Sequence, residues 1–377
     1  MNADTPADGG NAGMTPGTAA PAGDGAPTQL EWLRRRLRDL GARPAHEHRV
    51  LRLWSQALPQ DSGRRRLEDF MPARLRSALP QITATLASLA RLHSRHPSQD
   101  GGERLLLNLF DGQTVESVLL PRGGLCVSSQ VGCAVGCGFC MTGQGGLLRQ
   151  LGSAEIVAQV ALARTLRPVH KVVFMGMGEP AHNLDNVFDA IELLGTAGNV
   201  GHKNLVFSTV GDRRAFERLA QGVVRPALAL SLHSVSAERR AALLPRAPRI
   251  DPAELLELGE VYARATGYPV QVQWALLDGV NDGPDEIDGL VRLLRGKYAV
   301  LNLIPYNNVD GLPFRRPPAE RSAQMARTLH QRGVLTKLRQ SAAQDVEGGC
   351  GQLRARHAAG APLYWAPRTQ PVAGSAA

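Results

Sequence analysis

Residues 133–140 read Cys133-Ala-Val-Gly-Cys137-Gly-Phe-Cys140, a C-x3-C-x2-C run that follows a predicted strand. Glycines on both sides of the run let backbone amides approach a bound group closely. Three thiolates on one tight loop can ligate three irons of a [4Fe-4S] cubane, which leaves the fourth iron without a protein ligand. A small molecule with an amine and a carboxylate can chelate that open iron.

Two other uses of the three cysteines stay open on this spacing alone. A structural zinc normally takes four ligands from paired C-x2-C or Cys/His spacing. The run has no second pair or suitably placed histidine nearby, which counts against zinc. A cluster that only transfers electrons is the other alternative.

Short β-rich runs alternate with helical patterns after the cysteine run, and this alternation implies parallel strands joined by crossover helices. Starting from a strand near 125–129, about six β/α units fit, fewer than the eight of a closed barrel. The sequence therefore predicts an α/β fold, an open, partial (β/α)6 barrel. The predicted strands are 170–176, 204–209, 227–233, 270–276 and 298–305, and helical patterns include 153–166 and 251–265.

The amino-terminal third of the chain differs in composition from the rest. Residues 1–27 contain no aromatic side chain, so we expect a disordered tail. Leucines at helical spacing with arginines around them, beginning at Leu30, predict a basic amphipathic helix. Further apolar sets extend this to a small helical domain over 28–97. The core would span 98–357, with a second loose tail at 358–377.

A hairpin is predicted just before the cysteine run. The stretch 104–121 has β-type residues on either side of Asp111-Gly112, which is a strong hairpin signal. The carboxyl-terminal strand of this hairpin would lead directly into the segment that carries the cysteines.

Composition limits the classes of protein that the chain can be. The sequence is 43% hydrophobic and 20% charged, and no apolar run reaches the roughly 18 residues needed to cross a bilayer. No segment reads as a secretory signal, so we expect a cytoplasmic monomer without a membrane role. Five cysteines, four of them within one short window, do not suit a secreted disulfide framework.

The net charge is +9, and arginine carries nearly all of the excess. The guanidinium group is well shaped to contact phosphate oxygens, so a nucleic acid is the leading candidate partner. An arginine-rich solvated surface explains the same charge equally well. Charge alone does not separate the two interpretations.

Polar residues follow several predicted strands at the edge where partial barrels place their sites. The first such segment in the chain is Gly176-Met-Gly178-Glu179-Pro180. Its sequence is typical of a ligand-binding turn, and also of an ordinary tight turn between a strand and a helix. His233 is equally well explained as a satisfied core histidine. Together these groups surround one mouth of the barrel. The others are Ser208, Ser231, Leu232 and Asn307.

Two further cysteines and one glutamate stand out. Cys126 lies on the strand before the cluster run, and by default it is an inert buried thiol. Cys350 lies among three glycines in a loop suited to a reactive group. Glu116, on the predicted hairpin, is by default a solvated residue.

The motifs together resemble the RlmN/Cfr family of radical S-adenosylmethionine (SAM) RNA methyltransferases. Five separated motifs agree with that family in order and spacing over about residues 45–357, and the helical unit resembles its accessory RNA-binding domain. The motifs are Cys126-Val-Ser-Ser-Gln-Val-Gly-Cys133 with the cysteine run, Gly176-Met-Gly-Glu-Pro180, Ser231-Leu-His233, Ile304-Pro-Tyr-Asn307 and Cys350-Gly-Gln-Leu353.

The resemblance implies methylation of an adenine ring carbon in rRNA or tRNA, with C2 favoured over C8. It implies that Cys350 carries the methyl group, that Glu116 removes the ring proton, and that Cys126 releases the product by forming a disulfide with Cys350. Cellular thiols would reduce that disulfide. A reducing electron donor such as flavodoxin is also implied. The implied cluster ligands are Cys133, Cys137 and Cys140, and the implied SAM-binding residues are Gly178, Glu179, Ser208, Ser231, Leu232, His233 and Asn307.

The sequence departs from that family pattern around Cys350. A stretch that is commonly rich in Lys and Arg reads Arg339-Gln-Ser-Ala-Ala-Gln-Asp-Val346 here, which leaves the RNA substrate open. Another radical SAM enzyme would share the cluster run but would not need Cys126, Cys350 and Glu116 together. An iron-sulfur protein that binds RNA or senses redox state is the remaining alternative.

Overall fold

A ten-stranded mixed sheet forms the centre of the protein, in a computed structural model that describes residues 27–355. Its strands lie in the order β1-β2-β3-β4-β7-β8-β9-β10-β11-β12, and β5 and β6 form a small separate sheet. The strand bounds are β1 Ala90–Pro97, β2 Glu103–Leu109, β3 Thr114–Leu120, β4 Gly124–Cys126, β5 Gln130–Gly132, β6 Leu147–Gln150, β7 Lys171–Phe174, β8 Leu205–Thr209, β9 Ala227–Ser231, β10 Val270–Leu276, β11 Ala299–Pro305 and β12 Thr336–Leu338.

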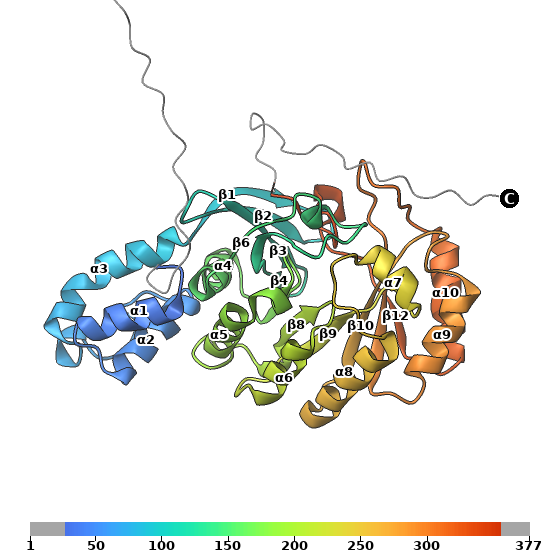
Figure 1. Ribbon diagram of the computed structural model, residues 1–377. Coiled ribbons are helices and arrows are strands. Elements are labelled where there is room, and N and C mark those ends of the chain that lie inside the picture. Colours follow the sequence, from blue (N-terminus) through green and yellow to red (C-terminus); the bar gives the residue numbers. More distant parts are fainter. Residues whose placement is uncertain (1–26, 356–377) are drawn as a thin grey trace, which may run out of the picture.

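The strands from β4 to β12 in the large sheet all pair in parallel, and helices connect most of them. Figure 1 shows these helices following one another along the outside of the curved sheet. Within residues 27–355, the edge strands β1 and β12 do not pair, so the barrel is open. The predicted fold class is confirmed. The helices of this part are α4 Ser153–Leu166, α5 Leu184–Gly195, α6 Arg213–Gln221, α7 Ala237–Leu243, α8 Pro252–Thr266, α9 Pro284–Leu294 and α10 Ala319–Gln331.

The core lies between the sheet and its helices. Trp274, Phe174 and Phe207 are the bulkiest of the completely buried side chains, and they come from three different parallel strands. Strands covered on both faces are expected to be almost continuously apolar. The sequence run ALALS of β9 shows this pattern.

The predicted hairpin is present. Strands β2 and β3 pair antiparallel with Leu106 opposite Glu116. Gly112 adopts a positive φ of 83° at the turn, a conformation that glycine reaches without steric cost. The Asp111 carboxylate accepts a hydrogen bond from the amide of Gln113, which closes the turn.

Three helices form the amino-terminal unit, as the sequence predicts: α1 (Leu30–Asp39), α2 (Pro44–Ser55) and α3 (Ala73–Ser88). The unit does not extend to residue 97, because residues 90–97 form β1 and pair with β2. This part of the prediction is wrong for a physical reason. Only one side chain in the middle of β1, Leu92, is large and apolar, so pairing with β2 rather than local pattern decides its structure.

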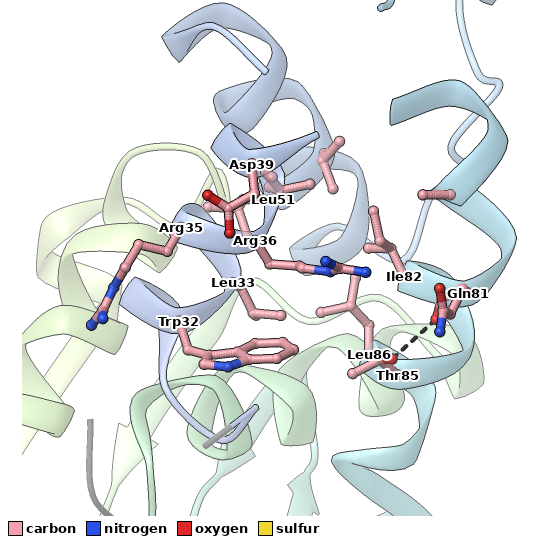
Figure 2. A pocket seen from close by; sticks show the side chains of 13 residues that line it. Trp32, Leu33, Arg35, Arg36, Asp39, Leu51, Gln81, Ile82, Thr85 and Leu86 are labelled. Carbon is pink, nitrogen blue, oxygen red and sulfur yellow. Dashed lines mark hydrogen bonds between the residues drawn. The ribbon is translucent and has the colours of Figure 1, made fainter. Parts of the chain in front are cut away.

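The helical unit packs against the barrel domain and has a groove of its own. Arg34 of α1 forms an ion pair with Asp189 of α5, with 3.1 Å between nitrogen and oxygen. The groove, about 570 Å³ in volume, lies among the three helices. Figure 2 shows Trp32 on one side of this groove, Ile82 on the other, and the Arg36 side chain extending from α1 toward Ile82.

Both predicted tails fall almost wholly outside residues 27–355, and the structure describes nothing of residues 1–26 and 356–377. Among the described helices, none combines the length and the apolar character that crossing a bilayer requires.

Gln159 on α4 joins the hairpin to the segment that leads to the cysteine run. Its side-chain oxygen accepts hydrogen bonds of 2.9 Å from the Ser117 hydroxyl and from the Ser128 amide. Its side-chain nitrogen donates to the Ser128 carbonyl. The Ser128 hydroxyl in turn accepts from the amide of Met177, so one buried amide side chain ties three elements together.

We expect Gln159→Leu to lower the free energy of unfolding by about 3 kcal/mol, because it leaves buried polar groups on β3 and at Ser128 unpaired. Chemical denaturation monitored by circular dichroism measures the change. Thr165→Ala, at an exposed position of the same helix, is the control and should alter stability by less than about 0.5 kcal/mol. Equal stability of the two variants would contradict the role given to Gln159.

Candidate active site

A cavity of about 200 Å³ opens at the carboxyl ends of the parallel strands. Strand ends, the cysteine loop and the loop after β12 all contribute to its wall. This is the edge of a parallel sheet at which βα loops can bring together groups from distant parts of a chain. The site residues predicted from the sequence that line it are Cys126, Cys133, Cys137, Cys140, Gly178, Glu179, Ser208, Ser231, His233, Asn307 and Cys350.

The cysteine loop runs from β5 to the short 3-10 helix Met141–Gly143. Gly136 has a φ of 67°, and a Cβ on Gly143 would lie only 2.8 Å from the Gly136 Cα, so the loop can fold this tightly only with glycine at both positions. The Gly138 amide donates to the Leu243 carbonyl over 3.0 Å, which fixes the loop against the end of α7. Arg246 donates to the Ala134 carbonyl from the same side.

The three thiols of this loop are surrounded by protein. Burial raises the pKa of Cys133 to about 12, and it also raises the pKa of Cys137 and of Cys140. Thiols in such surroundings stay protonated until a metal displaces the proton. The donor set is therefore three thiols on one loop. Within residues 27–355, no three His, Cys, Asp or Glu side chains are grouped closely enough to hold a single metal ion.

The Gly176–Pro180 turn follows β7 and brings Glu179 to the cavity. Gly178 has a φ of 102°, and a Cβ there would lie 2.6 Å from the Gln130 side chain. The Glu179 carboxylate accepts backbone hydrogen bonds from Ala181 and from Val210, each 3.0 Å long. Burial nevertheless raises the pKa of Glu179 to about 7. A buried carboxylate of this kind gains by pairing with a cationic group.

His233 has one ring nitrogen committed to the fold. Its Nδ1 accepts a 2.9 Å hydrogen bond from the Ala275 amide, and burial lowers the pKa of the ring to about 3. The imidazole is therefore neutral, with its proton on Nε2. Phe139 of the cysteine loop meets this ring edge to face, at a centroid distance of 4.9 Å. His233 is thus a buried histidine with a hydrogen-bond partner in the protein, and it also lines the cavity.

Asn307 after β11 contacts the Cys350 loop and retains an unused acceptor. Its side-chain nitrogen donates to the Ser341 hydroxyl and to the Cys350 carbonyl, each over 3.0 Å. Its side-chain oxygen is buried and has no hydrogen-bond partner in the described part of the chain, and the same holds for the hydroxyl oxygen of Tyr306. Unpaired polar atoms in a cavity wall are suited to the polar groups of a ligand.

Cys126 and Cys350 come from distant parts of the chain and line the same cavity. Burial raises the pKa of Cys126, and a thiolate on Cys350 would raise it further. Cys350 is solvent-accessible as a residue, while the protein packed around its thiol raises its pKa. The Ser341 hydroxyl donates a hydrogen bond to that thiol, which by itself lowers the pKa of Cys350.

Two predicted site residues do not line the cavity. Leu232 is completely buried between Ser231 and His233. Glu116 lies on β3 with only 1% of its surface exposed, so the expectation of a solvated residue is wrong. Its carboxylate is held by Arg104 and by two backbone amides of the segment after Cys350.

Ser341 and Gln273 line the cavity although the sequence reading did not select them. Ser341 follows β12, a strand of three residues that is too short to give a periodic signal. Its position after a strand is the only sequence signal that could have identified it. Arg240 was also missed, and it is a buried arginine beside Glu179 and Cys137.

Comparisons with known proteins agree with this geometry. Residues 127–294 match the Radical SAM superfamily. A "Probable RNA methyltransferase" of Methylibium petroleiphilum is 70% identical over 349 residues, which are 93% of this chain and 98% of that protein. The chain belongs to this family of radical SAM enzymes. A "Probable RNA methyltransferase" of Pseudomonas aeruginosa, 64% identical over 86% of this chain and 94% of its own length, is another relative.

A solved structure supports membership of the radical SAM methyltransferases at the level of the fold. The crystal structure of a radical SAM methyltransferase from Sphaerobacter thermophilus superposes with a TM-score of 0.74 at 34% identity, over 87% of this chain and 98% of that one. The chain is thus an enzyme, a radical SAM methyltransferase, and its cofactors are a [4Fe-4S] cluster and SAM. The trio of thiols and the unpaired polar atoms fit these two groups.

We expect Gly178→Ala to reduce the free energy of unfolding by about 3 kcal/mol, because a Cβ there is strained at positive φ and collides with Gln130. Thermal unfolding in the presence and absence of SAM checks this and should also show a smaller stabilisation by SAM. Gly145→Ala is the matched control, since no atom of the described residues lies within 4 Å of its added Cβ. A Gly178 variant as stable as the control would refute the strained turn.

Proposed function

We propose that this radical SAM enzyme methylates an adenine ring carbon of rRNA or tRNA, C2 in preference to C8, through a methyl group carried on Cys350. The observation that carries the proposal is the meeting of Cys126 and Cys350 in one cavity with the three thiols of the loop. A cluster that only transferred electrons would need neither of those two additional cysteines.

The chemistry of the target explains the need for a radical. An adenine C2 or C8 is an electron-poor sp² carbon whose hydrogen is barely acidic, so transfer of a methyl cation to it is unfavourable. The bound cluster and SAM supply the methyl group and a 5′-deoxyadenosyl radical. We assign Cys133, Cys137 and Cys140 as the cluster ligands.

The chain's own residues have distinct tasks in this proposal. Cys350 accepts the methyl group and links the carbon to the RNA base. Glu116 takes the proton from the ring carbon, and Cys126 attacks Cys350 so that a disulfide forms as the methylated RNA leaves. Cellular thiols then reduce the disulfide. Cys126 and Cys350 line the same cavity, which supports this pairing.

SAM would be held by the polar groups of the strand ends. Glu179 is a buried carboxylate near the cysteine loop and suits the ammonium group of the methionine moiety. Asn307 contributes a buried acceptor that has no hydrogen-bond partner among residues 27–355. The remaining proposed contacts are Gly178, Ser208, Ser231, Leu232 and His233, of which Leu232 can contribute through its backbone alone.

RNA is the substrate that the names of the relatives and the charge of the chain both support. Within the helical unit, over residues 28–89, arginines outnumber acidic residues two to one. We propose this unit as an RNA-binding surface, because its excess charge can replace counterions along a phosphate backbone. We also propose a cytoplasmic monomer that receives electrons from a reducing donor such as flavodoxin.

The segment 339–346 before Cys350 keeps Arg339 but lacks the other basic residues common in the RlmN/Cfr family. An arginine from another part of the chain lies beside it. Arg316 donates hydrogen bonds to the side-chain oxygens of Gln340 and Gln344, over 2.6 and 3.0 Å. A positive charge is therefore present beside the loop although the local sequence is neutral. Because this positive charge comes from Arg316 and not from the segment next to Cys350, we propose that this group of enzymes methylates an RNA site of its own.

The two cysteines can be separated by experiment. With RNA, SAM and reductant, Cys350→Ala should yield neither methylated RNA nor a protein–RNA adduct, because the carrier sulfur is missing. Cys126→Ala should yield an adduct that survives denaturing electrophoresis, because nothing breaks the carbon–sulfur link. Mass spectrometry of the protein and of digested RNA measures both outcomes.

Wild-type protein provides the reference, and it should show a methylated Cys350 after incubation with SAM. Full turnover by either alanine variant would refute the proposed cysteine roles. Production of no 5′-deoxyadenosine by the reduced wild-type enzyme would instead favour the redox-sensing alternative.

The RNA target is open to a direct comparison. We expect cells without the gene to lose one methyladenosine, 2-methyladenosine in preference to 8-methyladenosine, from rRNA or tRNA. Mass spectrometry of digested, separately purified RNAs detects the loss, and the gene restored on a plasmid should return it. Restoration by a gene encoding Cys350→Ala would contradict the proposal.

A further inference from the structure

The surroundings of Glu116 are unusual for a residue that must receive a proton from RNA. One carboxylate oxygen accepts a hydrogen bond from the Arg104 guanidinium. The other accepts from the backbone amides of Arg354 and Ala355, over 2.7 and 3.1 Å. The carboxylate is buried, and protein groups hold both of its oxygens.

Arg104 has a second contact that connects Glu116 to the methyl carrier. Its Nε donates a 2.6 Å hydrogen bond to the carbonyl of Val346. Val346 belongs to residues 343–355, which we call the Cys350 strap. The strap is also attached to the cysteine loop, where the Met141 amide donates to the Gly351 carbonyl over 2.8 Å.

The shape of the guanidinium group makes these two contacts interdependent. Its donors lie in one plane at fixed angles, so an arginine that binds two acceptors fixes their relative position. The Arg104 side chain is only 13% exposed, so the protein around it further restricts movement of the guanidinium group. Arg104 therefore adds a side-chain link at Val346 to the two direct hydrogen bonds that the strap amides of Arg354 and Ala355 make to Glu116.

The proposed reaction requires a defined distance between the base and the methyl carrier. While the ring carbon is bonded to the carbon on Cys350, its proton must lie within hydrogen-bond reach of Glu116. The base is on β3 and the carrier is on the strap, more than 200 residues apart in sequence. An error of about 1 Å in their alignment can reduce a rate about 100-fold.

We propose that Arg104 is a positioning residue that aligns the Glu116 carboxylate with the Cys350 strap for removal of the ring proton. This inference rests on the proposed function, in which Glu116 is the base and Cys350 the carrier. Arg104 does not touch the cavity, since it is absent from the lining that the structure describes.

A purely structural ion pair between the neighbouring antiparallel strands β1 and β2 provides the matched control. Arg95 on β1 forms an ion pair with Glu103 on β2, as Arg104 does with Glu116. The Arg95 side chain is 51% exposed and has no hydrogen bond to the strap among the described residues. Arg95→Met removes this ion pair between β1 and β2 without affecting the alignment of Glu116 with the strap.

The test measures three successive products with full-length enzyme, cluster, SAM, reductant and RNA. They are methylated Cys350, the protein–RNA adduct and methylated RNA. We expect Arg104→Met to methylate Cys350 within about twofold of wild type, to accumulate adduct, and to release methylated RNA about 100-fold more slowly. Arg104→Lys keeps the charge but loses the planar fork, so its release rate should lie between these values.

Three comparisons make the result specific to positioning. Arg95→Met should resemble wild type in all three products. Glu116→Gln should accumulate adduct, and the double variant with Arg104→Met should be no slower than Glu116→Gln alone, because both changes impair one step. Thermal unfolding of each variant identifies loss of folded protein.

Two results would overturn the inference. One is that Arg104→Met releases methylated RNA at the wild-type rate. The other is that Arg104→Met loses all three products equally and Arg95→Met loses them to the same extent. Failure of the proposed function has a different signature. If Glu116→Gln releases methylated RNA at the wild-type rate, Glu116 is not the base, and the role of Arg104 falls with it. If Glu116→Gln traps the adduct and Arg104→Met does not, only the inference about Arg104 is wrong.

Discussion

The convergence of parallel strand ends on one cavity is the constraint on which the rest of this enzyme depends. Because β4 and β7 to β11 run in the same direction, the residues that follow them lie at one edge of the sheet. Cys126, Ser208 and Asn307 meet there although 181 residues separate the first from the last. The barrel thus brings the predicted site residues together, and the loops supply their side chains.

Burial gives that cavity its chemical character. The three thiols of the loop, the Glu179 carboxylate and the His233 ring all have their charged forms disfavoured by the protein around them. Such a site would favour binding of an iron–sulfur cluster and a cationic ligand. Metal binding would stabilise the thiolate forms of the cysteines, and a cation would stabilise the buried carboxylate. Low polarity also protects reactive radical species from water.

Much of the fold could be predicted because its strands are short apolar runs separated by clear helical patterns. Strands β7 to β11 lie where the runs indicate, as does the hairpin around Asp111-Gly112. Local pattern failed at β1 and β12. The first has a single large apolar side chain in its middle and the second has three residues, so only pairing with neighbouring strands stabilises them.

The sequence by itself determined the cysteine run, the open barrel and eleven of the residues that line the cavity, since spacing and strand ends are local properties. Tertiary structure alone decided the surroundings of Glu116, the contact of Ser341 with Cys350, and the fork of Arg104 between β3 and the strap. These contacts join segments up to 242 residues apart. A local sequence pattern carries no record of which distant backbone group a side chain will reach, because that depends on how the whole sheet curves and packs.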